Sequence, residues 1–138
     1  MDEIIIDLEA YRKMETAAKD GYPHESCAIL LGAGNVISDI KIIKEGAGSC
    51  MAESFYQIDP LKLYEIEKET ERRSQKIIGF FHTHTFCEAL LSDEDKNYMI
   101  PEMIYVVLSL TETTVNRLKG YKKETENERI KEYEVKMI

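Results

Sequence analysis

The sequence predicts an α/β fold in which helices flank a mixed β-sheet. Short apolar runs rich in isoleucine and valine recur along the chain and are typical of strands. Between them lie stretches with apolar residues at helical spacing, which indicate amphipathic helices. The 138 residues suffice for a hydrophobic core that needs no disulfide or metal cross-link, and no linker or repeat divides the chain. We therefore expect a single domain over residues 1–138.

The predicted strands follow from runs of β-branched and aromatic residues. They are Glu3–Ile6, the apolar second half of Glu25–Gly32, Val36–Lys44, Ser54–Ile58, Lys76–Thr83, Met103–Leu110, Val115–Tyr121 and Ile130–Ile138. Ala33-Gly34-Asn35 has the composition of a hairpin turn between the second and third of these strands. We expect Lys76–Thr83 to be the central strand.

The predicted helices follow from capping residues and from apolar spacing. They are Leu8–Asp20 with Asp7 as N-cap, Pro60 to about Ser74 with Asp59 as N-cap, and Ser92 to about Met99. The residues expected to face the core are Leu8, Tyr11, Met14 or Glu15, and Ala18 in the first helix, and Leu61, Leu63, Tyr64 and Ile66 in the second. The many charged residues of the second helix are expected to form a solvated surface.

Composition excludes several classes of protein. The net charge is −8 with acids and bases interspersed, which argues against a sequence-independent nucleic-acid binder and is mildly compatible with a basic partner. No apolar run approaches the roughly 20 residues that span a membrane, and the N-terminus lacks the features of a signal peptide. We expect a cytoplasmic protein. The odd cysteine count, with no close pair, indicates free thiols, although a disulfide between two of them stays open.

The segment after the central strand carries the candidate chemistry. Because residues i and i+2 of a strand face the same side, His82 and His84 can point at one ion. Asp95 would complete a set of three ligands suited to zinc, with water in the fourth position. Zinc lowers the pKa of such a water toward neutrality, so we expect one catalytic ion. Ser92 could then hydrogen-bond the oxyanion of a tetrahedral intermediate.

Each of these residues also has a plain structural explanation. A histidine on an apolar strand is more often packed than ligating, and Ser92 with Asp95 resembles a capping box. His24 lies elsewhere and looks incidental. The combination of two histidines, a loop, a hydroxyl and a carboxylate is what favours a metal site.

This arrangement resembles the JAMM metalloprotease family, the MPN domain with a complete metal site. The family's motif is His-Ser/Thr-His, seven residues, Ser, two residues and Asp. The chain has His82-Thr83-His84, then Ser92 and Asp95, with no gap or shift.

The resemblance extends over roughly residues 1–121. Pro23-His24-Glu25 is similar to the Pro-x-Glu segment of the family, which maps the catalytic glutamate onto Glu25. Phe55–Pro60 is similar to the strand-to-helix step before the motif. The chain departs from the family at Thr85, where proline is usual, which puts the conformation of the following loop in doubt. Cys87 in that loop has either no role or that of a redox-sensitive fourth ligand.

The resemblance implies a curved mixed sheet sandwiched between helices, as in cytidine deaminases, with zinc at the sheet edge. It also implies a zinc-dependent peptidase or isopeptidase of the short prokaryotic type. Its substrate would be a ubiquitin-like or sulfur-carrier protein with a Gly-Gly tail, cut after the terminal glycine from a lysine conjugate or a C-terminal extension. Glu25 would be the general base and then acid. No nucleic acid or membrane is expected as a partner, and both monomer and homodimer stay open.

Two other functions stay open at this point. A non-catalytic MPN domain would serve as a scaffold or binding module, although such domains typically lack the metal ligands. A zinc hydrolase of a small-molecule amide could use the same fold, because fold and metal do not determine the substrate.

Overall fold

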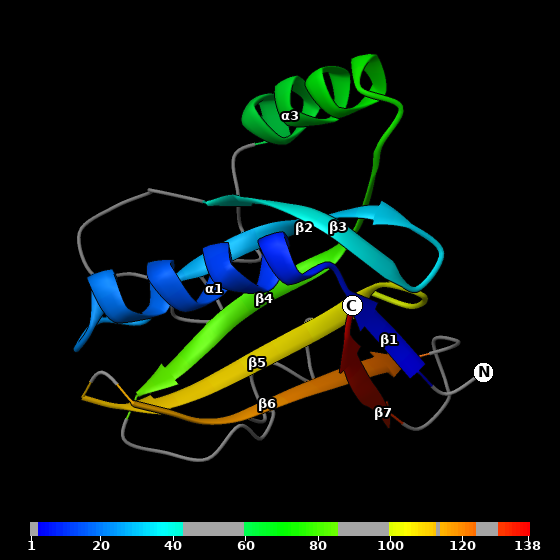
Figure 1. The fold of residues 1–138 in the computed structure, drawn as a ribbon. Coiled ribbons are helices and arrows are strands. Elements are labelled where there is room, and N and C mark those ends of the chain that lie inside the picture. The colour runs from blue at the N-terminus through cyan, green and yellow to red at the C-terminus, as the bar shows by residue number, and fades with distance from the viewer. Residues whose placement is uncertain (1–2, 43–59, 86–99, 113, 124–129) are drawn as a thin grey trace.

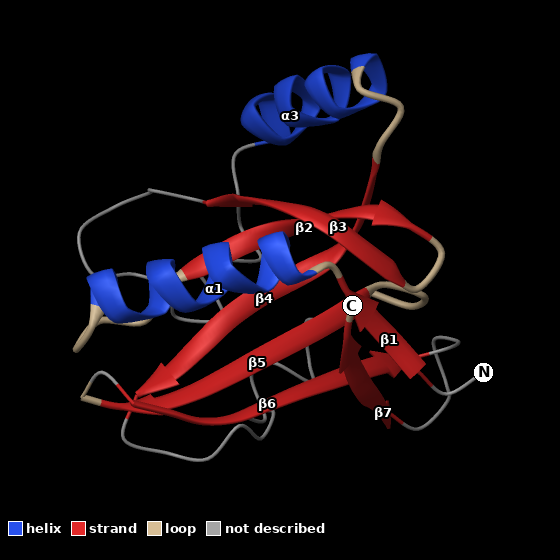
Figure 2. Ribbon diagram, in the orientation of Figure 1, coloured by secondary structure: helices blue, strands red, loops and turns tan. Residues whose placement is uncertain are grey.

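The structure is a computed structural model that describes residues 3–42, 60–85, 100–112, 114–123 and 130–138. The strands in these ranges are β1 (Glu3–Ile6), β2 (Cys27–Ala33), β3 (Val36–Ile42), β4 (Lys76–Thr85), β5 (Ile104–Thr111), β6 (Thr114–Lys123) and β7 (Ile130–Met137). The helices are α1 (Leu8–Gly21) and α3 (Pro60–Arg72). Figure 2 shows the two helices on the outside of one strongly curved sheet, which confirms the predicted α/β fold. The predicted strand Ser54–Ile58 and helix Ser92–Met99 lie outside the described residues.

The strands follow one another around the sheet in the order β1-β3-β2-β4-β5-β6-β7. The sheet closes on itself because β1 pairs in parallel with β3 on one side and with β7 on the other. β4 and β5 also pair in parallel, whereas β2–β3, β2–β4, β5–β6 and β6–β7 are antiparallel. The sheet is thus mixed and curved, as predicted, and β4 lies between β2 and β5. Closure through β1 is a finding that the sequence did not predict.

Two apolar clusters lie on opposite faces of this sheet. One contains Ala10, Met14 and Ala18 of α1 together with Phe81 of β4. The other contains Ile66 of α3 and the β4 residue Phe80, together with residues of β2, β5 and β6. Because successive side chains of a strand alternate, Phe80 and every second residue after it face the α3 side.

Helix α1 begins where Asp7 caps it. A carboxylate oxygen of Asp7 accepts a hydrogen bond from the backbone N–H of Glu9 at 2.8 Å. The buried face consists of Ala10, Met14 and Ala18, spaced four residues apart. Leu8 is 41% exposed, so its predicted place in the core is wrong. The small Ala10 takes the position instead, because α1 packs closely over β3 (Figure 1).

Helix α3 stands further from the sheet than the sequence predicts. Ile66 and Thr70 are buried, but Leu61 is 64% and Tyr64 is 54% exposed. The predicted core positions of Leu61 and Tyr64 are therefore wrong, and the side chain of Leu63 lies outside the described part. A polar cavity of about 200 Å³ lies between α3 and the hairpin of β2 and β3. The helix therefore packs through only part of its length.

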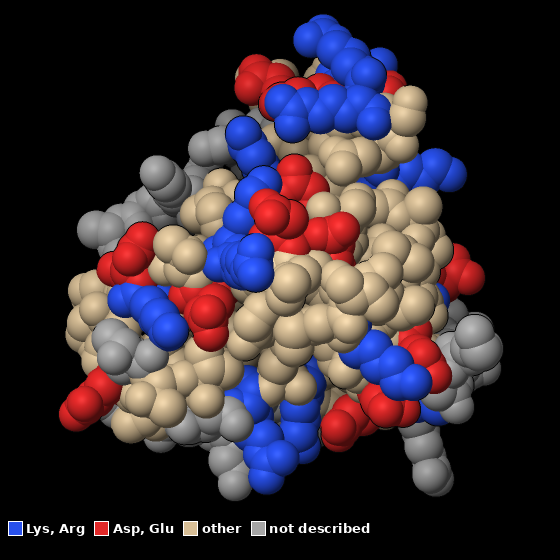
Figure 3. All heavy atoms as spheres, in the orientation of Figure 1, with Lys and Arg blue, Asp and Glu red and all other residues tan. Residues whose placement is uncertain are grey.

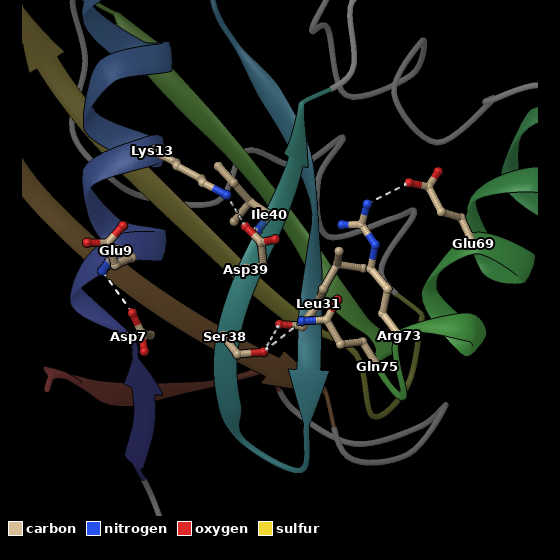
Figure 4. A network of polar contacts seen from close by, with 10 residues as sticks. All are labelled: Asp7, Glu9, Lys13, Leu31, Ser38, Asp39, Ile40, Glu69, Arg73 and Gln75. Atoms are coloured by element: carbon tan, nitrogen blue, oxygen red, sulfur yellow. Dashed lines mark hydrogen bonds and ion pairs between the residues drawn. The ribbon is translucent and has the colours of Figure 1, made fainter.

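Polar contacts link β3 to helix α1 and to the segment between α3 and β4 (Figure 4). Lys13 of α1 donates to Asp39 at 2.6 Å, and Gln75, just before β4, donates to the Ser38 hydroxyl at 3.4 Å. The guanidinium of Arg73 pairs with Glu69 at 3.3 Å on α3 itself. Of the ion-paired side chains only Asp39 is half-buried and the others are exposed, so these ion pairs contribute little to stability. Within the described ranges, neither helix is long and apolar enough to cross a membrane.

Candidate active site

His82 and His84 lie next to each other near the C-terminal end of β4, on the α3 side of the sheet. Their Nε2 atoms are 3.0 Å apart and their ring centroids 4.8 Å apart. Both side chains are buried, with 5% and 8% exposure. Two nitrogens at this distance either share one proton or both point lone pairs at a common cation. The predicted convergence of the two imidazoles is therefore present.

The spacing of the two nitrogens fits zinc. A tetrahedral ion that binds nitrogen at about 2.05 Å holds two such donors about 3.3 Å apart. The observed 3.0 Å differs by no more than a small rotation of the rings would remove. Within the described ranges no third histidine, cysteine or carboxylate joins them. The third predicted ligand, Asp95, lies outside those ranges, as do Ser92 and Cys87.

The segment that contains Glu25 is tied to the histidine strand. Cys27 pairs with His82 in the antiparallel ladder of β2 and β4. One residue earlier, the N–H of Thr83 donates to the carbonyl of Ser26 at 2.9 Å, and the N–H of Ser26 donates to the Thr83 hydroxyl at 2.7 Å. Glu25 is the next residue before Ser26, so its backbone lies one position beyond this contact, on the side of His84. The structure thus brings the segment of Glu25 next to the histidine strand, although the two lie far apart in the sequence.

Cys27 corrects the prediction of free thiols, because it takes part in a disulfide bond. The other two cysteines, Cys50 and Cys87, lie outside the described residues. The sequence could not reveal this bond, since disulfide pairing depends on which residues the fold brings together. Thr85 also differs from expectation, because it is the last residue of β4 and pairs with Leu110 instead of beginning the loop.

Ser109 belongs to the same face of the sheet and was missed in the sequence. It pairs with His84 across β4 and β5 and is 2% exposed. A serine inside the apolar run Val106–Leu110 was the signal that could have drawn attention to it. His24 lies exposed in the turn before β2, which agrees with its incidental role.

Comparison with known protein families shows to which family the chain belongs. Residues 7–120 match the family described as prokaryotic homologues of the JAB domain. The chain belongs to the JAB family. This result confirms the family-level resemblance drawn from the histidine motif.

Among curated proteins, this JAB protein is similar to the desampylase of Pyrococcus furiosus (strain ATCC 43587 / DSM 3638 / JCM 8422 / Vc1), with 25% identity over 71 residues. The similar stretch covers 51% of this chain and 49% of the relative, so it spans about half the length of that enzyme.

Solved structures show the same fold. A solution structure of a protein from Desulfitobacterium hafniense has a TM-score of 0.76 at 20% identity and covers 98% of this chain and 92% of its own. A structure described as a metalloprotease-like JAMM zinc site in the proteasome and signalosome has a TM-score of 0.62 at 16% identity. It covers 98% of this JAB protein and 97% of its own chain. At these identities the likeness concerns the fold.

Proposed function

We propose that this JAB protein is a zinc-dependent metallopeptidase or isopeptidase. Its substrate is a ubiquitin-like or sulfur-carrier protein, and the bond cut follows the C-terminal glycine. The observation that carries the proposal is the pair of buried imidazoles 3.0 Å apart, with the segment of Glu25 hydrogen-bonded to Thr83 between them. The similarity to a desampylase and the likeness to a JAMM zinc-site structure support it.

In this proposal the metal is held by His82, His84 and Asp95. When bound, zinc supplies a Lewis acid that lowers the pKa of water toward neutrality. Burial of His82 and His84 keeps water from competing with their nitrogens and holds the rings in one orientation.

The remaining chemistry belongs to side chains. Glu25 accepts the proton of the attacking water and then donates it to the departing amine. The hydrogen bonds between Ser26 and Thr83 support this role, because they hold the segment of Glu25 beside the histidine strand. Ser92 donates a hydrogen bond to the oxyanion that develops on the substrate carbonyl.

The substrate carries a Gly-Gly tail, joined either to a lysine or to a C-terminal extension. We place this activity in the cytoplasm, with a monomer or homodimer as the working form. Nucleic acid and membranes are not part of the proposal.

The test is incubation of the zinc-loaded protein with the host's ubiquitin-like proteins, each carrying a C-terminal extension or a lysine conjugate. Cleavage after the terminal glycine is expected from the unmodified protein. Glu25→Ala should keep its zinc and lose turnover, whereas Asp95→Ala should lose both. His24→Ala is the matched control, because His24 lies exposed in the turn just before Glu25 and should keep full activity.

The outcomes separate this proposal from its rivals. Full turnover by Glu25→Ala would remove Glu25 as the general base. Purified protein that binds no zinc and cleaves nothing would indicate a scaffold or binding module. Cleavage of small amides without cleavage of ubiquitin-like substrates would indicate a small-molecule hydrolase on the same fold.

A further inference from the structure

A row of three residues crosses the sheet beside the candidate active site. His84 of β4 pairs with Ser109 of β5, and Ser109 pairs with Arg117 of β6. Residues that pair directly across neighbouring strands point to the same face, so Arg117 shares the face of the two histidines. With strands about 4.8 Å apart, the Cα of Arg117 lies roughly 10 Å from that of His84. A substrate bound at the histidines is therefore within reach of an extended arginine side chain.

Ser109, which lies between His84 and Arg117 in this row, is a small residue. In the preceding row Val107 stands between His82 and Lys119, and it belongs to the apolar cluster on this face. In the row of His84 the same place is taken by Ser109, which has no branched apolar side chain to separate the histidine from β6. Ser109 is buried, so the two rows differ in the size and polarity of the middle side chain.

Arg117 differs from its neighbour in its charge partners. Lys119 pairs with Glu132 of β7 at 3.7 Å. Arg117 is exposed, and no ion pair links it to another described residue. Among the described residues, Lys119 thus has a carboxylate partner and Arg117 does not.

Strand β6 is also basic on an otherwise acidic chain. It contains Arg117, Lys119, Lys122 and Lys123 and no acidic residue, while the whole chain has a net charge of −8. In Figure 3 lysine and arginine side chains gather below the middle of β6. Because side chains alternate along a strand, Arg117, Lys119 and Lys123 share one face, and a negatively charged group that approaches this face is attracted to it.

We propose that Arg117 is a specificity-determining residue that binds a carboxylate of the substrate next to the bond to be cut. The inference rests on the proposed peptidase function and adds that the preferred substrate carries a carboxylate near the bond to be cut. A guanidinium suits this role because it can donate two parallel hydrogen bonds to one carboxylate. The carboxylate is either an acidic side chain beside the modified lysine or the free C-terminus of the leaving segment.

The experiment uses three synthetic isopeptides with the same Gly-Gly-to-lysine linkage. The first is neutral and amidated, the second is amidated with aspartate beside the lysine, and the third is neutral with a free C-terminal carboxylate. Binding is measured by calorimetry to zinc-loaded Glu25→Ala protein, so that cleavage does not interfere. The kcat/KM values are measured separately with Glu25 intact.

We expect one of the carboxylate peptides to bind about tenfold or more tightly than the neutral one, the size of a charge-assisted hydrogen bond. Arg117→Gln should abolish this preference and leave the neutral peptide unchanged, whereas Arg117→Lys should keep part of it. Lys119→Gln is the matched control and should keep the preference, because Lys119 already pairs with Glu132. The peptide that shows the preference identifies the source of the carboxylate.

Equal binding of all three peptides, or a preference that survives in Arg117→Gln, would overturn the inference. Loss of the preference in Lys119→Gln would also overturn it, since the general charge of β6 would then be the cause. Carboxylate-selective binding without any cleavage would refute the proposed function and retain the role of Arg117. Cleavage without carboxylate selectivity would support the proposed function and refute the role of Arg117.

Discussion

At the scale of single residues, Thr83 connects the two halves of the candidate site although its side chain faces away from it. It is completely buried. Its hydroxyl accepts a hydrogen bond from the N–H of Ser26, and its own N–H donates to the carbonyl of Ser26. These two bonds set the position of the neighbouring Glu25. In the proposed function, Thr83 therefore lies between two metal ligands and also anchors the segment of the general base.

Thr83→Val tests this role, because valine has the shape of threonine without the hydroxyl. The N–H of Ser26 would lose its partner, at a cost of about 1–3 kcal/mol in unfolding free energy. We also expect kcat to fall while zinc content stays unchanged, because the histidines remain and only Glu25 loosens. Thr83→Ser keeps the hydroxyl and should keep kcat. Unchanged kcat in Thr83→Val would show that Glu25 is positioned by other contacts.

Tyr105 makes stability depend on pH in the alkaline range. Burial raises its pKa to about 12, although the hydrogen bond from the N–H of Ile100 at 2.8 Å lowers it. In the unfolded chain tyrosine ionises near 10. As pH rises, Tyr105 therefore loses its hydroxyl proton in the unfolded chain before it does so in the folded protein. The contribution of Tyr105 to the unfolding free energy is fully present below pH 10 and decreases as pH rises toward 12.

We expect the unfolding free energy from urea titrations to be lower at pH 11 than at pH 9. Tyr105→Phe should reduce this difference, because it removes the hydroxyl whose pKa is raised by burial. Part of the difference should persist, since burial also raises the pKa of Tyr121 to about 12. An identical loss of stability in the wild type and in Tyr105→Phe would contradict the assignment.

At the scale of elements, the parallel pairing of β4 with β5 depends on a close approach at Gly79. A Cβ atom placed on Gly79 would lie 1.9 Å from the carbonyl oxygen of Ile104. A side chain there would push apart the two strands that carry the histidines and Ser109. Glycine at this position is therefore a packing requirement.

Gly79→Ala should lower the unfolding free energy by about 2 kcal/mol or more, as overpacking does. Gly34→Ala is the comparison, because Gly34 has φ +60° and open space around its Cβ position. That change should cost only about 1 kcal/mol, the strain of a left-handed residue with a side chain. Denaturant titration of both variants checks the order, and a smaller loss in Gly79→Ala would contradict the close approach.

Among the described side chains of helix α3, only Ile66 and Thr70 are buried. Ile66 is 8% exposed, whereas Leu61 is 64% exposed near the N-terminal end of the helix. Ile66→Ala should therefore cost about 2–4 kcal/mol in unfolding free energy, and Leu61→Ala less than about 0.5 kcal/mol. Similar losses in both variants would show that the first turn of α3 is packed in solution.

At the scale of the whole molecule, we expect the fold to form without the proposed metal. The two apolar clusters contain neither His82 nor His84, and the sheet is closed by β1 through backbone pairing. Chelation should therefore abolish peptide cleavage. It should lower Tm only by the amount that corresponds to the lost free energy of zinc binding. Circular dichroism before and after chelation measures this, and unfolding on chelation would make the site structural instead.

The sequence by itself determined the elements and the chemical candidates. Every described strand and helix overlaps a predicted one, because periodicity and capping act within a few residues of the chain. The convergence of His82 and His84 could be predicted for the same reason, since their i, i+2 spacing places both on one side of a strand. Zinc ligation by these residues and Asp95 remains a prediction.

Only the tertiary structure decided which distant segments meet. The pairing of Ser26 with Thr83, which brings Glu25 toward His84, depends on the register of β2 against β4. The disulfide of Cys27 and the exposure of Leu61 likewise follow from packing between elements. Local patterns do not record such contacts, because they depend on how strands align and how closely helices approach the sheet. The row from His84 to Arg117 across β5 is therefore visible only in the folded protein.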